Sequence, residues 1–201
     1  MSWIDVNWKQ ERPSIKQIAR LWDSVDITVL SETFPAVEEY LAELRRINTN
    51  GGAFIARFHI NGNEDFDWFA TRNRWDEMDF FRRLMSHAAF ANALPEVAKN
   101  VDTAELAKFE WSSSLILDGE LARTLVVGGA YEKFEGTPRE AKTLGGRVAD
   151  SLFGDRFNDV LVFQCWKPWS SWFFDVAWDG TTVLIDKGLQ IVTVLVSTDT
   201  D

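Results

Sequence analysis

Three tryptophans recur at intervals of three in the segment Trp166-Lys167-Pro168-Trp169-Ser-Ser-Trp172. Pro168 favours an extended segment, because the residue before a proline is biased away from the helical conformation. A ledge of aromatic rings with Lys167 at its rim has the composition of a hot spot for a protein partner. The opposite interpretation, in which the three rings belong to the hydrophobic core, stays open on the sequence alone.

Asp175 is the one acidic side chain inside the aromatic run around these tryptophans. A carboxylate among apolar neighbours needs a partner, and a structural ion pair with Arg156, Arg147 or Lys167 is the ordinary explanation. The functional alternative is a tryptophan-lined pocket polarised by Asp175, Arg156 and Tyr131. Such a pocket would be a concave apolar cavity with convergent polar groups, suited to a cationic or hydroxylated ligand.

Signatures of catalysis and of metal binding are weak. His59 and His87 are the only histidines, and neither has a local ligand spacing around it. Cys165 is expected to be a small buried hydrophobe rather than a nucleophile. The pair Gly128-Gly129 lacks the glycine spacing and the lysine of phosphate-binding loops, and it predicts a turn where two backbones approach. We therefore predict no catalytic residue, no metal site and no cofactor.

The segment 159–197 must position the tryptophans and Asp175, and its pattern predicts a β-meander of three to four strands. Asp179-Gly180 and Lys187-Gly188 are both typical of two-residue hairpin turns. The first turn makes residues 172–178 a strand in which Trp178 pairs with Thr181.

The predicted register assigns the meander's side chains to two faces. It places Val183 beside Val192 on an apolar face that belongs to the core. The opposite face is mixed rather than polar and needs a cover, either a helix or a partner. Its residues are Phe173, Asp175, Ala177, Thr182, Leu184, Asp186, Ile191, Thr193 and Leu195. If a partner covers this mixed face, that partner can be a second copy of the chain, which would form a homo-oligomer.

The remaining chain predicts helices interleaved with strands. A capping box at Thr137-Pro138-Arg139-Glu140 is the best helix start in the sequence. Apolar residues at helical spacing predict further helices over 15–25, 35–47 and 74–94, and alternation predicts a strand at 26–30 and a hairpin of strands 53–60 and 65–70. We expect one α+β domain over 1–201, with a helix-rich part at 13–155, the meander at 159–197, and an antiparallel sheet packed against amphipathic helices.

Composition limits the classes of partner. A net charge of −10 and a pI near 4.7 argue against nucleic-acid binding, which requires clustered lysine and arginine. The acidic balance suits a basic protein partner. One cysteine excludes an internal disulfide, and no segment has the pattern of a signal peptide or a membrane span. We expect a cytoplasmic protein that is not associated with a membrane.

Two functions from different classes follow from these observations. The first is a non-enzymatic intracellular binding module that neutralises or scaffolds a basic protein; toxin-neutralising immunity proteins have this general profile, although the likeness is compositional and has no residue-level match. The second is a small-ligand-binding protein or enzyme with the pocket near Asp175. An exposed acidic and aromatic patch favours the first function, and a deep cavity favours the second.

Overall fold

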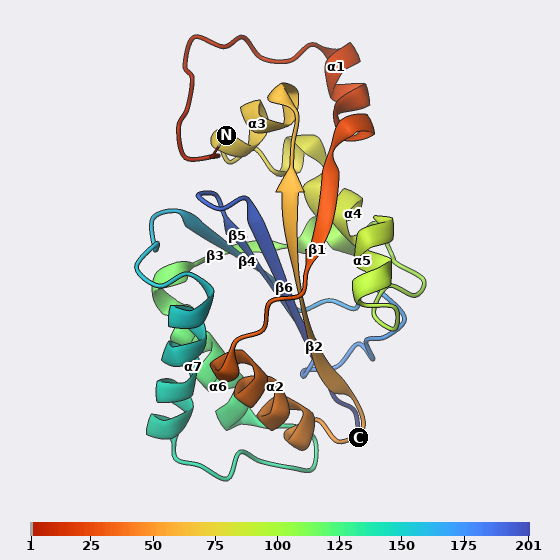
Figure 1. Ribbon diagram of the computed structural model, residues 1–201. Coiled ribbons are helices and arrows are strands. Elements are labelled where there is room, and N and C mark those ends of the chain that lie inside the picture. The colour runs from red at the N-terminus through yellow and green to blue at the C-terminus, as the bar shows by residue number, and fades with distance from the viewer. Residues whose placement is uncertain (1) are drawn as a thin grey trace.

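A six-stranded antiparallel sheet runs through the middle of the molecule (Figure 1). The computed structural model describes residues 2–201, except for the side chain of Ala107. Every neighbouring pair of strands is antiparallel, and the spatial order is β1-β2-β6-β5-β4-β3. The strands are β1 (Asp26–Leu30), β2 (Gly52–Asn61), β3 (Glu110–Ser113), β4 (Val160–Cys165), β5 (Gly180–Asp186) and β6 (Ile191–Thr198). The short strands β1 and β3 form the two edges.

Helices cover both faces of this sheet (Figure 1). On one face lie α2 (Pro35–Ile47), α6 (Leu117–Val127) and α7 (Pro138–Leu152). On the other lie α3 (Glu64–Thr71), α4 (Phe80–Met85) and α5 (Ala88–Ala93). Shorter elements join them, namely α1 (Ile15–Arg20) and the 3-10 turns Leu21–Ser24, Asp76–Met78, Glu105–Lys108 and Ser114–Ile116. The α+β class and the C-terminal meander of β4, β5 and β6 are confirmed.

Alternation along the strands divides the apolar residues between two cores. Val183 and Ile185 of β5 pack with α3, α4 and α5, whereas Leu184 between them packs with α2, α6 and α7. The mixed face of the meander is therefore covered by helices of the same chain, and Leu184 and Thr193 on it are buried. A second subunit is not needed as the cover of this face.

The predicted register of β5 and β6 is wrong by two residues. Val183 pairs with Val194, not with Val192, because the turn has four residues, from Lys187 to Gln190, and not two. Gln190 takes a positive φ of 56° in this turn. A shift of two residues leaves every side chain of β5 and β6 on its predicted face, since the pleat has a period of two.

The predicted strand at 172–178 does not form. Residues 166–179 are a long irregular connection, and β4 pairs directly with β5, so that Cys165 lies opposite Thr181. The Asp179-Gly180 pair is consequently not a hairpin turn, and Trp178 does not pair with Thr181. The segment cannot extend as a strand because the side chains of Trp169 and Asp179 are both buried, and Asp179 binds backbone N–H groups of the segment itself.

The predicted hairpin at 53–60 and 65–70 is half correct. Residues 53–60 lie in β2, but residues 65–70 belong to helix α3. The Asn63 side chain caps α3 by accepting the backbone N–H of Phe66 (2.9 Å), and Glu64 and Asp65 in the first turn favour the helix dipole. The partners of β2 are instead β1 and β6.

The predicted helix at 74–94 is also interrupted. It divides into a 3-10 turn, α4 and α5, with Asp79 in the left-handed region (φ 57°) before α4. The capping box at Thr137 is confirmed and begins α7. Among residues 2–201, no helix has the length and apolar character needed to cross a bilayer.

Candidate functional site

The connection between β4 and β5 is held by the buried carboxylate of Asp179. Its Oδ2 accepts the backbone N–H of Val176 (3.2 Å) and its Oδ1 accepts that of Phe174 (3.4 Å). The Thr198 hydroxyl of β6 donates to the same carboxylate. At its other end, the N–H of Ser171 donates to the Lys99 carbonyl (3.1 Å). The connection is therefore fixed to the sheet and to the 95–103 segment.

The three tryptophans of the predicted ledge have three different environments. Trp169 is fully buried between Phe90 and Phe173, and its indole N–H donates to the Thr181 hydroxyl (2.8 Å). Trp172 is half-buried against Phe54, with ring centroids 5.5 Å apart. Only Trp166 and its neighbour Lys167 are exposed. A continuous ledge is thus absent, because Trp169 belongs to the core.

Asp175 lies at the exposed surface of the same connection, with a positive φ of 57°. Arg156, the partner considered for it, is paired with the buried carboxylate of Asp186 (2.8 Å). Arg147 is paired with Glu39 on α2 (2.8 Å). The structure therefore does not bring Asp175 and Arg156 together.

Tyr131 is an exposed side chain in the connection between α6 and α7. The preceding residue, Ala130, donates its backbone N–H to the buried carboxylate of Asp199 (2.8 Å). Since Asp199 follows β6, Tyr131 lies at the end of the sheet where β6 finishes. Trp166 follows β4 at this same end, next to Gly180 at the start of β5.

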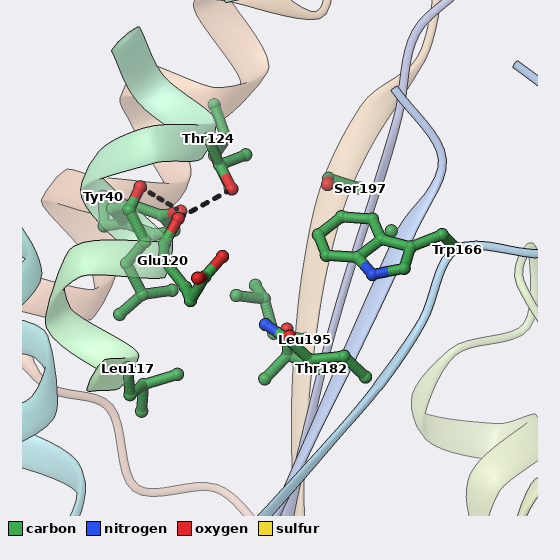
Figure 2. A pocket seen from close by; sticks show the side chains of 12 residues that line it. Tyr40, Leu117, Glu120, Thr124, Trp166, Thr182, Leu195 and Ser197 are labelled. Carbon is green, nitrogen blue, oxygen red and sulfur yellow. Dashed lines mark hydrogen bonds between the residues drawn. The ribbon is translucent and has the colours of Figure 1, made fainter. Parts of the chain in front are cut away.

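A narrow cleft opens between α6 and the sheet beside Trp166 (Figure 2). Its open volume is about 350 Å³, solvent included, and its enclosed part has room for a water molecule but for nothing larger. Apolar side chains of α2, α6 and β6 form much of the wall, among them Leu44, Leu117, Leu121 and Leu195. The indole of Trp166 lies across Gly180, where an added Cβ would be 3.1 Å from the ring. Glycine at position 180 therefore permits this ring position.

The strand side of the cleft is polar. Gln164 of β4, Thr182 of β5 and Ser197 of β6 line it. Within residues 2–201, no hydrogen bond is made by any of these three side chains, although Ser197 is more than nine-tenths buried. The cleft thus presents an amide and two hydroxyls that are available to a bound molecule.

The helix side of the cleft contributes Tyr40, Thr124 and Glu120 (Figure 2). The Tyr40 hydroxyl donates to the Leu121 carbonyl (3.1 Å), and burial raises the pKa of this phenol well above its usual value, so Tyr40 remains neutral. Thr124 donates to the Glu120 carbonyl (3.1 Å). The Glu120 carboxylate is left to project into the gap toward the strands (Figure 2).

A guanidinium group lies at the mouth of the cleft. Arg123 of α6 donates through Nε to the Glu120 carboxylate (3.1 Å), and its Cζ lies 5.5 Å from the centroid of the Trp166 ring. The carboxylate and the aromatic face therefore hold a cation between them. Trp166 was predicted as a site residue, but Glu120, Arg123, Gln164 and Thr182 were missed, since their spacing is that of an ordinary solvated helix face and strand.

The sheet edge next to this cleft carries exposed apolar side chains. Glu110 of β3 pairs with Gln164, so β3 adjoins the cleft, and β3 is paired on one side only. Trp111 on β3 and Leu115 and Ile116 just after it are exposed. Trp111 lies beside Phe163 on the sheet face covered by α4, and Trp166 lies on the opposite face beside the cleft, so these side chains flank the edge on both faces. We name Trp111, Leu115, Ile116 and Trp166 the β3-edge surface.

Comparisons with known proteins find no relatives. No protein-family model matches the chain, and neither a curated protein nor a solved structure is similar to it. Among residues 2–201, no group of three or more histidine, cysteine, aspartate or glutamate side chains is placed to bind a metal ion.

Proposed function

We propose that the protein is a non-enzymatic cytoplasmic binding module that covers a basic surface of another protein through the β3-edge surface. The observation that supports this proposal is the exposure of four large side chains along one short edge strand and its neighbours. Trp111 is 61% exposed, Leu115 71%, Ile116 50% and Trp166 43%. Side chains of this size at a surface are the usual anchors of protein interfaces.

The two tryptophans of this surface are held in place from behind. The Trp111 ring packs edge-on against Phe163 of β4 with centroids 5.6 Å apart, and Phe163 in turn packs on Phe81 of α4 at 5.1 Å. Trp166 is supported by the backbone of Gly180. Rigid anchors lose little conformational entropy on binding, which favours affinity.

Charge argues for a basic partner. Four carboxylates lie in residues 105–120, and three of them are paired, Glu105 with Lys108, Asp118 with Lys142 and Glu120 with Arg123. Among the described residues, Glu110 on β3 takes part in no ion pair. This unpaired carboxylate and the net charge of −10 attract lysine and arginine side chains and disfavour acidic surfaces. Neutralising such a partner needs only that the module occupy its basic surface.

The proposal is tested by affinity capture from a lysate of the native host with matched variants. The test variant is Trp111→Ser with Leu115→Ser. The control variant is Trp8→Ser with Ile15→Ser, which removes two apolar side chains that are even more exposed and lie in the N-terminal segment and α1. We expect a basic protein to be retained by the wild type and the control variant and lost by the test variant.

Retention should also weaken as salt rises, because screening reduces attraction between exposed charges. Equal capture by both variants, or capture of acidic proteins only, would contradict the proposal. Circular dichroism of each variant establishes that it is folded before capture is compared.

A further inference from the structure

We propose that the mouth of the cleft, between the exposed Trp166 ring and the Glu120 carboxylate, is an acceptor site for an arginine side chain of the partner, and that Arg123 occupies it as a replaceable internal cation. This inference rests on the proposed function and adds to it the chemical group that is recognised. Three features support it: the position of Arg123, the unused polar wall of the cleft, and the exposure of the Trp166 ring.

The position of Arg123 shows which chemistry the site accommodates. Its guanidinium is placed over the Trp166 face at 5.5 Å while Nε donates to Glu120 at 3.1 Å. A planar cation that stacks on an indole and hydrogen-bonds to a carboxylate is how proteins commonly recognise arginine. The site therefore already holds a guanidinium, but one that reaches it from the same helix, three residues after Glu120.

The internal cation uses the site incompletely. Among residues 2–201, Nε is the one Arg123 donor in a hydrogen bond, whereas a guanidinium has five N–H donors. The acceptors that remain unused are the Gln164 amide oxygen and the hydroxyls of Thr182 and Ser197 on the strand side. An arginine that stacks on the exposed Trp166 ring from outside can direct its fork of donors toward the outer edge of this wall, and the enclosed part of the cleft has room for a bridging water molecule.

A second arginine–tryptophan pair, Arg74 with Trp68, is a purely structural contact, and the Arg123–Trp166 pair differs from it in exposure. Arg74 lies 5.5 Å from the Trp68 centroid and pairs with Glu77 (2.7 Å), so its contacts match those of Arg123. Trp68, however, is buried, and Arg72 already lies 4.4 Å from the same ring. Trp166 is 43% exposed and has a cleft beside it.

Displacement of Arg123 is easy on structural grounds. More than half of its side chain is exposed, so the guanidinium can turn into water without leaving an unsatisfied buried group. The incoming group then takes over the contacts with Glu120 and Trp166. Arg123 thereby lowers the affinity for arginine without blocking the site.

The experiment is a titration of the full-length protein followed by NMR at the Trp166 indole N–H, assigned with a Trp166→Phe variant. The probe is Nα-acetyl-L-arginine amide, and Nα-acetyl-L-citrulline amide is its uncharged isostere. Arg123→Gln removes the internal cation, Glu120→Gln removes the carboxylate, and Arg74→Gln is the matched control. No protein partner is present, so the result is independent of whether one is captured.

We expect the arginine probe to shift the Trp166 resonance and the citrulline probe to leave it unchanged. Arg123→Gln should tighten probe binding about tenfold, since one exposed ion pair and one cation–π contact no longer compete. Glu120→Gln should weaken it by a similar factor, and Arg74→Gln should have no effect.

Three results would overturn the inference: equal shifts with citrulline, no response of Trp166 in any variant, or unchanged affinity in Arg123→Gln. Probe binding as expected, without capture of a basic protein, would instead leave the acceptor site standing and count against the proposed function alone.

Discussion

Replacing Asp179 by asparagine is expected to destabilise the protein far more than the same change at Asp175. The two residues are four positions apart in one connection, but Asp179 is buried and Asp175 is exposed. The sequence singled out Asp175 as the carboxylate among aromatic residues that needs a partner. In the structure Asp179 is the buried carboxylate that holds the connection. The pair of variants therefore tests the conformation of the connection directly.

The magnitude follows from the hydrogen bonds of Asp179. Its carboxylate accepts two backbone N–H groups and the Thr198 hydroxyl, and an asparagine amide replaces one acceptor oxygen by a donor. At least one buried donor then faces an NH2 group and loses its partner. A hydrogen bond to a charged group contributes about 1.5–3 kcal/mol, so the loss should be about 2–3 kcal/mol. For a chain of this size that corresponds to a fall in Tm of about 4–12 °C.

Asp175→Asn is the internal control, because asparagine tolerates the left-handed backbone that Asp175 adopts. Its effect should stay within about 0.5 kcal/mol, as for other exposed positions. Thermal and urea unfolding followed by circular dichroism measure both variants. A larger effect at Asp175, or equal effects at the two positions, would refute the conformation described for residues 166–179.

Other parts of the fold give three further predictions. Gly129→Ala should destabilise the protein strongly, because an added Cβ would lie 2.1 Å from the Ile47 carbonyl oxygen; unchanged urea unfolding would show that the connection after α6 does not pack there. Cys165 should react with a thiol reagent only on unfolding, since burial raises the pKa of its thiol, and rapid labelling of the native protein would contradict its position under the 166–179 connection. Asp67→Asn should stabilise the protein near pH 7 and not near pH 3. Burial raises the pKa of the Asp67 carboxyl, although the Trp3 indole N–H donates to it (2.9 Å). The stability of the wild type therefore falls as pH rises from the ordinary aspartate range through the raised pKa. A difference in Tm between variant and wild type that does not change with pH would contradict this.

Elements with local signals were predictable from the sequence. The capping box at Thr137 begins α7, and the apolar spacing of residues 35–47 matches α2. The alternation of apolar residues in β2, β5 and β6 also predicted the correct faces. A register error of one residue would move every side chain of a strand to the opposite face of the sheet, so the pattern specifies the face strongly. These predictions depend only on residues that are close together in the sequence.

The connection at 166–179 could not be predicted because it depends on distant contacts. Phe174, Val176 and Trp178 alternate as in a strand, but their backbone is fixed by Asp179, and Asp179 itself depends on Thr198 of β6. The burial of Trp169 depends on Phe90, some 80 residues earlier in the chain. In α3, by contrast, a local signal existed, namely Asn63 followed by acidic residues, and the aromatic alternation obscured it.

The candidate site was predictable only in part. Trp166 was identified by its residue type, whereas Glu120 and Arg123 have the spacing of an ordinary i,i+3 pair on a helix. Their role depends on the approach of α6 to β4 and β5, which no local pattern encodes.

Hydrogen–deuterium exchange of the captured complex would locate the partner on this chain. If the β3-edge surface binds it, amides of residues 110–116 and 164–167 should exchange more slowly in the complex than in the free protein, while those of α3 at the other end of the sheet should be unchanged. Protection confined to α3 or to the N-terminal segment, with β3 unaffected, would contradict the proposed interface.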